Sequence, residues 1–306
     1  MRSSPKLLRL VVAPHRRIRL WLRLRFYLIV LRVAARLPLS IGYAVARLVG
    51  RLRYRFRPRP LHVNADVMRA LGAAPAQVEG WARQNCELRA SGELEASRYP
   101  RMSREAFSRL IGIEGLENLD AALAKGRGAL LYSCHSWSSH TFFGALAALG
   151  YPPTIVGYPP GRELAPAERS FLRRRAAALE KRFGCRFIWM QAGNLGVAVK
   201  AANVLRRNGI VVMLVDFPHR KSAVEVRFLE HRSSFTLGPA FVAKEIGAPL
   251  LDFFIHREKG WFPQVAEIGA PFWVQGNPEE AAQECASMLE PHVRRDPAAW
   301  TRLWER

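Results

Sequence analysis

Gly128-Ala-Leu-Leu-Tyr-Ser-Cys134 is a short apolar run that leads into His135-Ser-Trp-Ser-Ser-His140 and then into Thr141-Phe-Phe-Gly-Ala-Leu-Ala-Ala-Leu149. The run has the length and composition of a strand buried on both faces, and the segment after the histidines resembles a helix. A buried strand that delivers a histidine to the start of a helix places that side chain at the carboxyl edge of an α/β sheet, where such folds bind ligands. His135 is therefore a candidate general base.

The alternation of strands and helices continues on both sides of this stretch. We expect strands at 129–134, 153–157, 185–190, 210–215 and 249–255, and helices at 63–71, 76–95, 116–124, 141–149, 164–183, 194–207 and 238–246. Two late segments, 224–229 and 262–268, are expected as antiparallel additions at the edge of the sheet. The pattern predicts an α/β fold with a mixed, mostly parallel sheet flanked by helices.

The positive charge of the chain is concentrated in its first 60 residues. The 306 residues carry a formal net charge of +22. Residues 1–60 hold 16 Lys and Arg and no acid, whereas the remainder holds 31 basic and 25 acidic residues. Apolar residues make up 49% of the chain, which is typical of a globular protein. We expect a basic segment at 1–60 and one α/β domain at 61–306.

The basic segment is too interrupted by arginine to cross a membrane. Its longest stretches without charge, 26–31 and 37–46, are shorter than the roughly 20 apolar residues that a spanning helix needs. Leu, Trp, Phe and Tyr beside arginine instead favour an amphipathic helix that lies on an anionic membrane surface. A signal peptide, an organellar transit peptide and a nucleic-acid-binding arm fit the composition less well.

Two further observations limit the chemistry. Cys86, Cys134, Cys185 and Cys285 are far apart and form no CxxC pair, which argues against a disulfide framework and a zinc site and is typical of a reducing compartment. A second polar cluster, Asp216-Phe-Pro-His219-Arg220-Lys221, directly follows the apolar strand at 210–215. Two strands that end in titratable groups can face one crevice, so Asp216 and His219 join His135 as candidates.

At this point the sequence resembles a known family, the bacterial lipid A biosynthesis (lauroyl/myristoyl) acyltransferases within the lysophospholipid and glycerolipid acyltransferase superfamily. The resemblance covers most of the chain and depends on the order and spacing of several short blocks. These are Leu37-Pro38, 59–64, 112–128, Leu214-Val-Asp216, Val226-Arg-Phe-Leu229, Phe235-Thr-Leu-Gly238-Pro, Gly247-Ala-Pro249 and Asp296-Pro297-Ala-Ala-Trp300.

The family motif is a histidine followed after four residues by Asp or Glu. His135 matches the histidine, but His140 stands at the acidic position. A carboxylate would hold the imidazole in the correct tautomer and stabilise its cation, and a comparable loss in a serine protease costs about 10⁴ in rate. Either another acid supplies this charge, with Asp216 as our candidate, or the catalysis is weaker, altered or absent.

The resemblance implies an acyl transfer at the cytoplasmic face of a bacterial inner membrane by a peripheral, monotopic enzyme. His135 would take a proton from a hydroxyl of a lipid or glycolipid acceptor, which then attacks an acyl thioester of acyl carrier protein or coenzyme A. The implied catalytic residues are His135, His140 and Asp216, and the implied substrate-binding residues are Ser136, Trp137, Arg175, His219 and Arg220. No metal or further cofactor is implied, and no nucleic acid.

Other interpretations stay open from the sequence. The basic helix with Arg173-Arg-Arg175 and Lys181-Arg182 is either a solvated face or a docking surface for an acidic carrier protein or for substrate phosphates. A metal hydrolase built from His135, His140, His219 and Asp216 lacks the i,i+4 histidine spacing of known helical sites. A non-catalytic member of the same fold would bind acyl chains or lipid without turnover.

Overall fold

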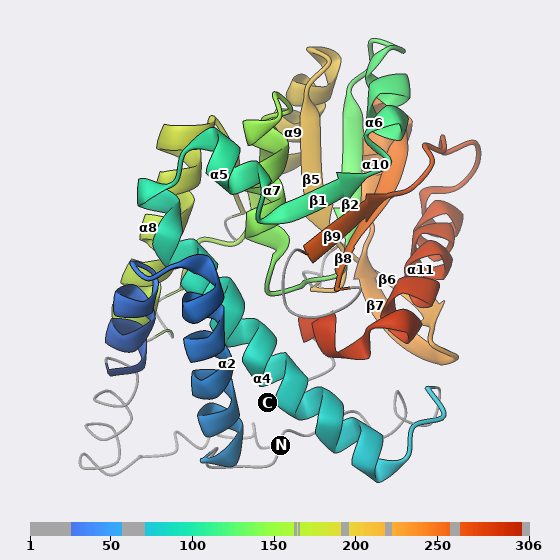
Figure 1. Ribbon diagram of the computed structural model, residues 1–306. Coiled ribbons are helices and arrows are strands. Elements are labelled where there is room, and N and C mark those ends of the chain that lie inside the picture. The colour runs from blue at the N-terminus through green and yellow to red at the C-terminus, as the bar shows by residue number, and fades with distance from the viewer. Residues whose placement is uncertain are drawn as a thin grey trace, which may run out of the picture.

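The computed structural model describes residues 26–56, 71–161, 164, 166–190, 196–217, 222–257 and 264–301. A central sheet of seven strands has the order β1-β9-β8-β2-β5-β3-β4, and a separate two-stranded sheet pairs β6 with β7 (Figure 1). The strands are β1 Ile111–Glu114, β2 Ala129–Ser133, β3 Pro153–Gly157, β4 Arg186–Trp189, β5 Ile210–Leu214, β6 Ala223–Phe228, β7 His231–Thr236, β8 Leu250–His256 and β9 Gln264–Ile268.

Helices flank the central sheet, and the alternation of side chains along its strands produces a core on each face. Along β2, Leu130 and Tyr132 belong to one core with residues of α9, α10 and α11, whereas Ala129 and Leu131 belong to the other with residues of α5, α6, α7 and α8. The helices are α2 Leu39–Arg55, α4 Pro75–Arg98, α5 Arg104–Ser108, α6 Leu116–Leu123, α7 Ser139–Ala148, α8 Pro166–Phe183, α9 Gly196–Arg206, α10 Gly238–Ile246 and α11 Pro278–Arg295, with 3-10 turns η1 Tyr99–Arg101 and η3 Pro297–Ala299.

The predicted fold class is confirmed: all neighbouring strands of the central sheet are parallel except β8 and β9. The sequence missed the short edge strand β1, which pairs with β9. The segment at 262–268 is antiparallel to β8 as expected, but β9 lies between β8 and β1 and not at the edge. The predicted helix at 63–71 lies almost wholly outside the described residues.

The expectation for residues 224–229 was wrong. This segment forms β6 and pairs with β7 in a hairpin outside the central sheet. Leu229 and Glu230 both have positive φ angles, 52° and 64°, as in the tight turns that match the twist of a two-stranded hairpin. The hairpin is held on α11, where Gln283 accepts a hydrogen bond from the Arg227 backbone at 2.7 Å.

The helix α2 packs across α4, and a buried carboxylate ties both to the domain. Glu95 of α4 is fully buried and accepts hydrogen bonds from Tyr43 of α2, Thr141 of α7 and Gln264 of β9. Burial raises the pKa of the Glu95 carboxyl in spite of these donors. Because one side chain joins three elements, α2 is attached to the start of the helix that follows His135.

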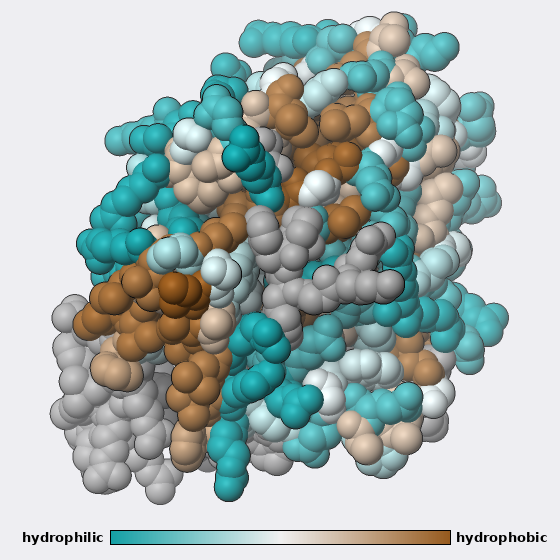
Figure 2. Space-filling view, viewed as in Figure 1, coloured by the Kyte–Doolittle hydropathy of each residue, from teal (hydrophilic) through white to brown (hydrophobic). Residues whose placement is uncertain are grey.

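The outward face of α2 is apolar. Ile41, Leu48 and Leu52 lie on one side of the helix and are 50%, 57% and 46% exposed; we call these three residues the apolar strip. Residues 26–34 are helical as well, and Figure 2 shows hydrophobic side chains gathered over this region and α2. No helix within the described ranges has both the length and the apolar character needed to cross a membrane.

Candidate active site

His135 and Asp216 meet because the strands that carry them are neighbours in register. Ser133 of β2 lies opposite Leu214 of β5, so the residues two positions later emerge side by side at the carboxyl ends of the two strands. The His135 Nδ1 atom lies 2.5 Å from Asp216 Oδ1. The backbone N–H of His135 also donates to both carboxylate oxygens, each at 3.1 Å.

Asp216 is fully buried, yet hydrogen bonds stabilise its negative charge. Trp300 Nε1 donates to Asp216 Oδ2 at 2.8 Å, in addition to the donors of His135. Burial of the carboxylate raises its pKa, but the charge of His135 and the hydrogen bonds from His135 and Trp300 outweigh burial, so the pKa of Asp216 lies below its ordinary value. The carboxylate is ionised at neutral pH and can stabilise a positive imidazole.

The imidazole is held on several sides and remains accessible. Its side chain is 36% exposed, and the Phe217 ring contacts it edge-on with 4.7 Å between ring centroids. The C-terminal tail pairs with the same loop, since Ser136 and Trp300 form a β-bridge and the Thr301 N–H donates to the His135 carbonyl at 2.9 Å. With Nδ1 bound to the carboxylate, Nε2 is the ring atom left for chemistry.

His140 does not contact Nδ1 of His135. Its ring lies against Phe143 and Phe187, with centroid distances of 5.5 Å and 6.4 Å. Burial lowers the pKa of His140 well below its ordinary value, and the charges of Arg175 and His135 act in the same direction. At neutral pH this ring is uncharged, and the negative charge beside His135 comes from Asp216.

Arg175 lies on α8 near this histidine. Its Nε atom is buried and has no hydrogen-bond partner among the described residues. Burial lowers the pKa of Arg175, while the nearby Tyr99 and Glu93 oppose that effect. A buried N–H group without a partner among these residues has unused capacity to donate to an anion.

Ser136 contacts the start of α7, and Trp137 contacts α4. The Ser136 and Ser139 hydroxyls are 3.1 Å apart. Trp137 Nε1 donates to Asn85 at 3.2 Å, and the Arg89 guanidinium stacks 4.8 Å from the Trp137 ring. Both residues line a cavity of about 10 Å³ with Arg257 and Gln264, which has room for about one water molecule.

The other predicted substrate residues, His219 and Arg220, lie outside the described residues, as does Lys221. Sequence reasoning did not assign Trp300 or Phe217 to the site. The Asp296-Pro297-Ala-Ala-Trp300 tail was a signal for the former, because it belongs to the blocks that carry the family resemblance. Among the described residues no three His, Cys, Asp or Glu side chains are grouped so that they could hold a metal ion.

Comparison with known proteins identifies the family of the chain. Two phosphatidylinositol mannoside acyltransferases of Mycobacterium tuberculosis, from strains CDC 1551 / Oshkosh and ATCC 25618 / H37Rv, are each 27% identical to the chain over 251 residues, which is 80% of this chain and 76% of theirs. A family model described as bacterial lipid A biosynthesis acyltransferase matches residues 12–306. The chain is therefore an acyltransferase and belongs to the bacterial lipid A biosynthesis acyltransferase family.

Proposed function

We propose that this enzyme transfers a fatty acyl group from the thioester of acyl carrier protein or coenzyme A to a hydroxyl of a lipid or glycolipid, with His135 as the general base. The observation that carries this proposal is the geometry of the His135 imidazole. Its Nδ1 atom lies 2.5 Å from Asp216 Oδ1, and the same side chain is 36% exposed. A proton held on Nδ1 by the carboxylate leaves the Nε2 lone pair to accept a proton from an alcohol.

In the proposed reaction Nε2 of His135 removes the proton from the acceptor hydroxyl as its oxygen attacks the thioester carbonyl carbon. The ionised Asp216 stabilises the imidazolium that forms. The carbon–sulfur bond then breaks, and the thiolate takes the proton from the imidazolium, which restores the base. No acyl-enzyme is needed, and Cys134 next to the base is only 1% exposed.

Arg175 is the side chain that we assign to anion stabilisation. Its buried Nε atom, without a partner among the residues that the structure describes, can donate to the tetrahedral oxyanion or to a substrate phosphate, together with local backbone N–H groups. The exposed Arg173 and Arg174 of the same helix are suited to an acidic carrier protein.

The acceptor that we propose is a lipid or glycolipid hydroxyl and not lipid A in particular. The matched family is named for lipid A biosynthesis, whereas the two mycobacterial relatives are named for phosphatidylinositol mannoside. We propose that the enzyme works as a peripheral protein on the cytoplasmic face of a bacterial inner membrane. The acid-free basic segment at 1–60 and the exposed apolar strip support this location.

The experiment that tests the function supplies purified protein with acyl-carrier-protein or coenzyme A thioesters and with membrane lipid extracts, and reads new acylated lipids by mass spectrometry. We expect turnover with one donor class and a loss of about 10²–10⁴ for His135→Ala. His231→Ala, which removes a histidine from the β6–β7 hairpin, is the matched control and should retain turnover. Unchanged turnover in folded His135→Ala would exclude His135 as the base.

A further inference from the structure

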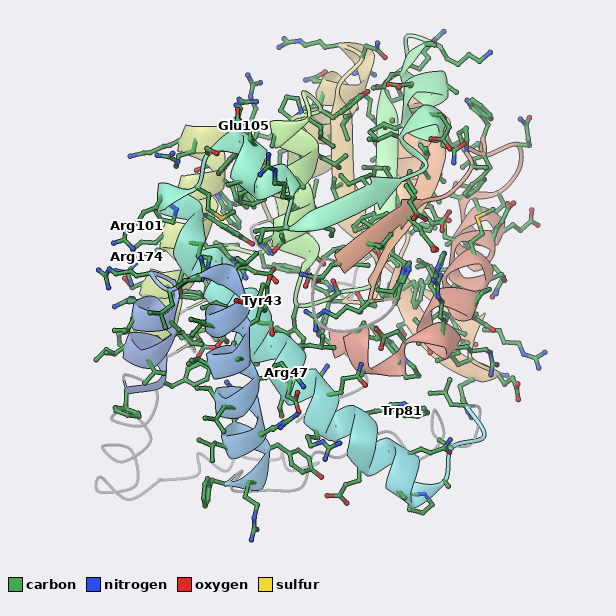
Figure 3. All side chains as sticks on the ribbon, in the orientation of Figure 1. Tyr43, Arg47, Trp81, Arg101, Glu105 and Arg174 are labelled. Carbon is green, nitrogen blue, oxygen red and sulfur yellow. The ribbon has the colours of Figure 1, made fainter. Side chains whose placement is uncertain are left out.

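A groove between α2 and α4 is separate from the His135–Asp216 pair and has no part in the mechanism above. Its volume is about 390 Å³. We call it the arginine groove, and the side chains that line it are Arg47, Arg51, Gln77, Gly80, Trp81, Arg83, Gln84 and Glu87. Arg47 lies where α2 meets α4, and Trp81 comes from α4 (Figure 3).

The groove exists because the two helices cross closely at a glycine. A Cβ atom on Gly50 would lie 2.5 Å from the Glu87 Cα atom, so only a residue without a side chain allows this approach. Arg47 and Arg51, one turn apart on α2, flank the crossing point and reach the same carboxylate on α4. Helix packing therefore brings their charges together at a fixed place.

The groove carries an excess of positive charge. The Nε atoms of Arg51, Arg47 and Arg83 lie 3.1, 3.6 and 4.0 Å from the Glu87 carboxylate. That carboxylate is 4% exposed, whereas the three arginine side chains are 53%, 35% and 61% exposed. Glu79, about two turns before Glu87 on α4, accepts a hydrogen bond from Tyr54 and does not line the groove. Among the described side chains that line the groove, three guanidinium groups thus face one buried carboxylate.

This combination suits a phosphate. Guanidinium groups bind phosphate oxygens through paired N–H donors and are the preferred cations for this purpose. Gln77 and Gln84 add amide donors, and the Trp81 ring adds a flat apolar surface. The volume of about 390 Å³ is within the range of small-ligand sites, so the groove is large enough for a small phosphate-bearing headgroup.

The apolar strip indicates that the phosphate belongs to a lipid. Leu48 and Leu52 directly follow Arg47 and Arg51 in the sequence, so they lie about 100° around α2 from them. When the strip enters the boundary between headgroups and acyl chains, the arginines stand at the level of the phosphates. Figure 2 shows hydrophilic side chains beside the hydrophobic patch, on the side toward α4.

From these observations we propose that the arginine groove binds the phosphate headgroup of an anionic membrane phospholipid, at a site distinct from the catalytic pair. The groove would hold α2 at the membrane surface in a defined orientation. Through Tyr43 and Glu95, that orientation extends to α7 at the active site.

The test measures binding of dihexanoyl phosphatidylglycerol, a soluble short-chain lipid, to the full chain labelled with 5-fluorotryptophan. The fluorine signal of Trp81 is assigned with Trp81→Phe. We expect saturable movement of this signal and an affinity at least ten-fold weaker for Arg51→Gln/Arg83→Gln. The matched double variant Arg55→Gln/Arg109→Gln, which removes two exposed arginines outside the groove, should change the affinity by less than two-fold.

Further variants and ligands identify the group that binds and the site where it binds. Glu87→Gln removes the competing carboxylate and should strengthen binding at least three-fold, which a weakened fold would not do. His135→Ala should bind the lipid as the wild type does, so this test is independent of the proposed catalysis. The proposal is overturned if the two double variants lose affinity equally, if dihexanoyl phosphatidylcholine binds as tightly, or if inorganic phosphate alone reproduces the affinity.

Discussion

Replacement of Asp216 by Asn tests the central pair most directly. The amide keeps the shape of the side chain but removes its charge. If the amide oxygen accepts from Trp300 Nε1, its NH₂ group faces the backbone N–H and Nδ1 of His135. Nδ1 must then accept, which moves the imidazole proton to Nε2 and blocks the atom that should receive the proton of the acceptor hydroxyl.

The expected loss of kcat follows from the distance between His135 and Asp216. At 2.5 Å and an effective dielectric constant of about 20, opposite unit charges attract by about 6–7 kcal/mol. Because the His135 side chain is 36% exposed, solvent weakens this attraction, and we take about 4–5.5 kcal/mol. This energy acts when the imidazole is protonated in the transition state, so kcat should fall by about 10³–10⁴.

The assay is acyl transfer by purified variants, with circular dichroism and thermal unfolding to verify the fold. Asp252→Asn is the matched control, because Asp252 is also buried and lies 3.1 Å from His292 Nε2 in a second Asp–His pair. It should lose stability but keep kcat within a few-fold. A folded Asp216→Asn enzyme that retains more than a tenth of the wild-type kcat would refute the reasoning.

The Asp216→Asn variant should also change how the free energy of unfolding depends on pH in acid. Because the pKa of Asp216 is lowered in the folded chain, its charge stabilises the fold above the unfolded-state pKa near 4, and this stabilisation is lost as the pH falls through the lower folded value. The free energy of unfolding of Asp216→Asn should therefore fall less steeply than that of the wild type below about pH 4 in urea titrations.

Four other substitutions probe the residues around the site and the crossing of α2 and α4. Trp300→Phe removes the indole donor but keeps an aromatic ring, and we expect kcat to fall by about ten-fold with little change in KM. His140→Glu restores the acid of the family motif next to the positive charge of Arg175, so turnover should be preserved or raised. A large loss of turnover would show that the His140 imidazole has a role of its own. Gly50→Ala should cost about 1–3 kcal/mol of unfolding free energy because the added carbon meets α4, whereas Gly80→Ala, with open space around it, should stabilise the helix by up to about 1 kcal/mol.

The sequence by itself determined the fold class and predicted which residues along the chain carry the chemistry. Apolar runs at 129–134 and 210–215 have the period and length of buried strands, and the residues that follow a parallel strand must emerge at its carboxyl end. His135 and Asp216 were identified for that reason. The concentration of arginine in residues 1–60 likewise needs no structure to be seen.

Only the tertiary structure decided which groups touch. Strand order and register are set by packing over the whole domain, so the contact between His135 and Asp216, 81 residues apart, and the donor Trp300, a further 84 residues along, could not be read from local patterns. The arginine groove depends in the same way on a close helix crossing at Gly50. Local residue patterns predict elements and their ends, whereas the distances that create a charge pair or a binding groove come from contacts between elements distant in the chain.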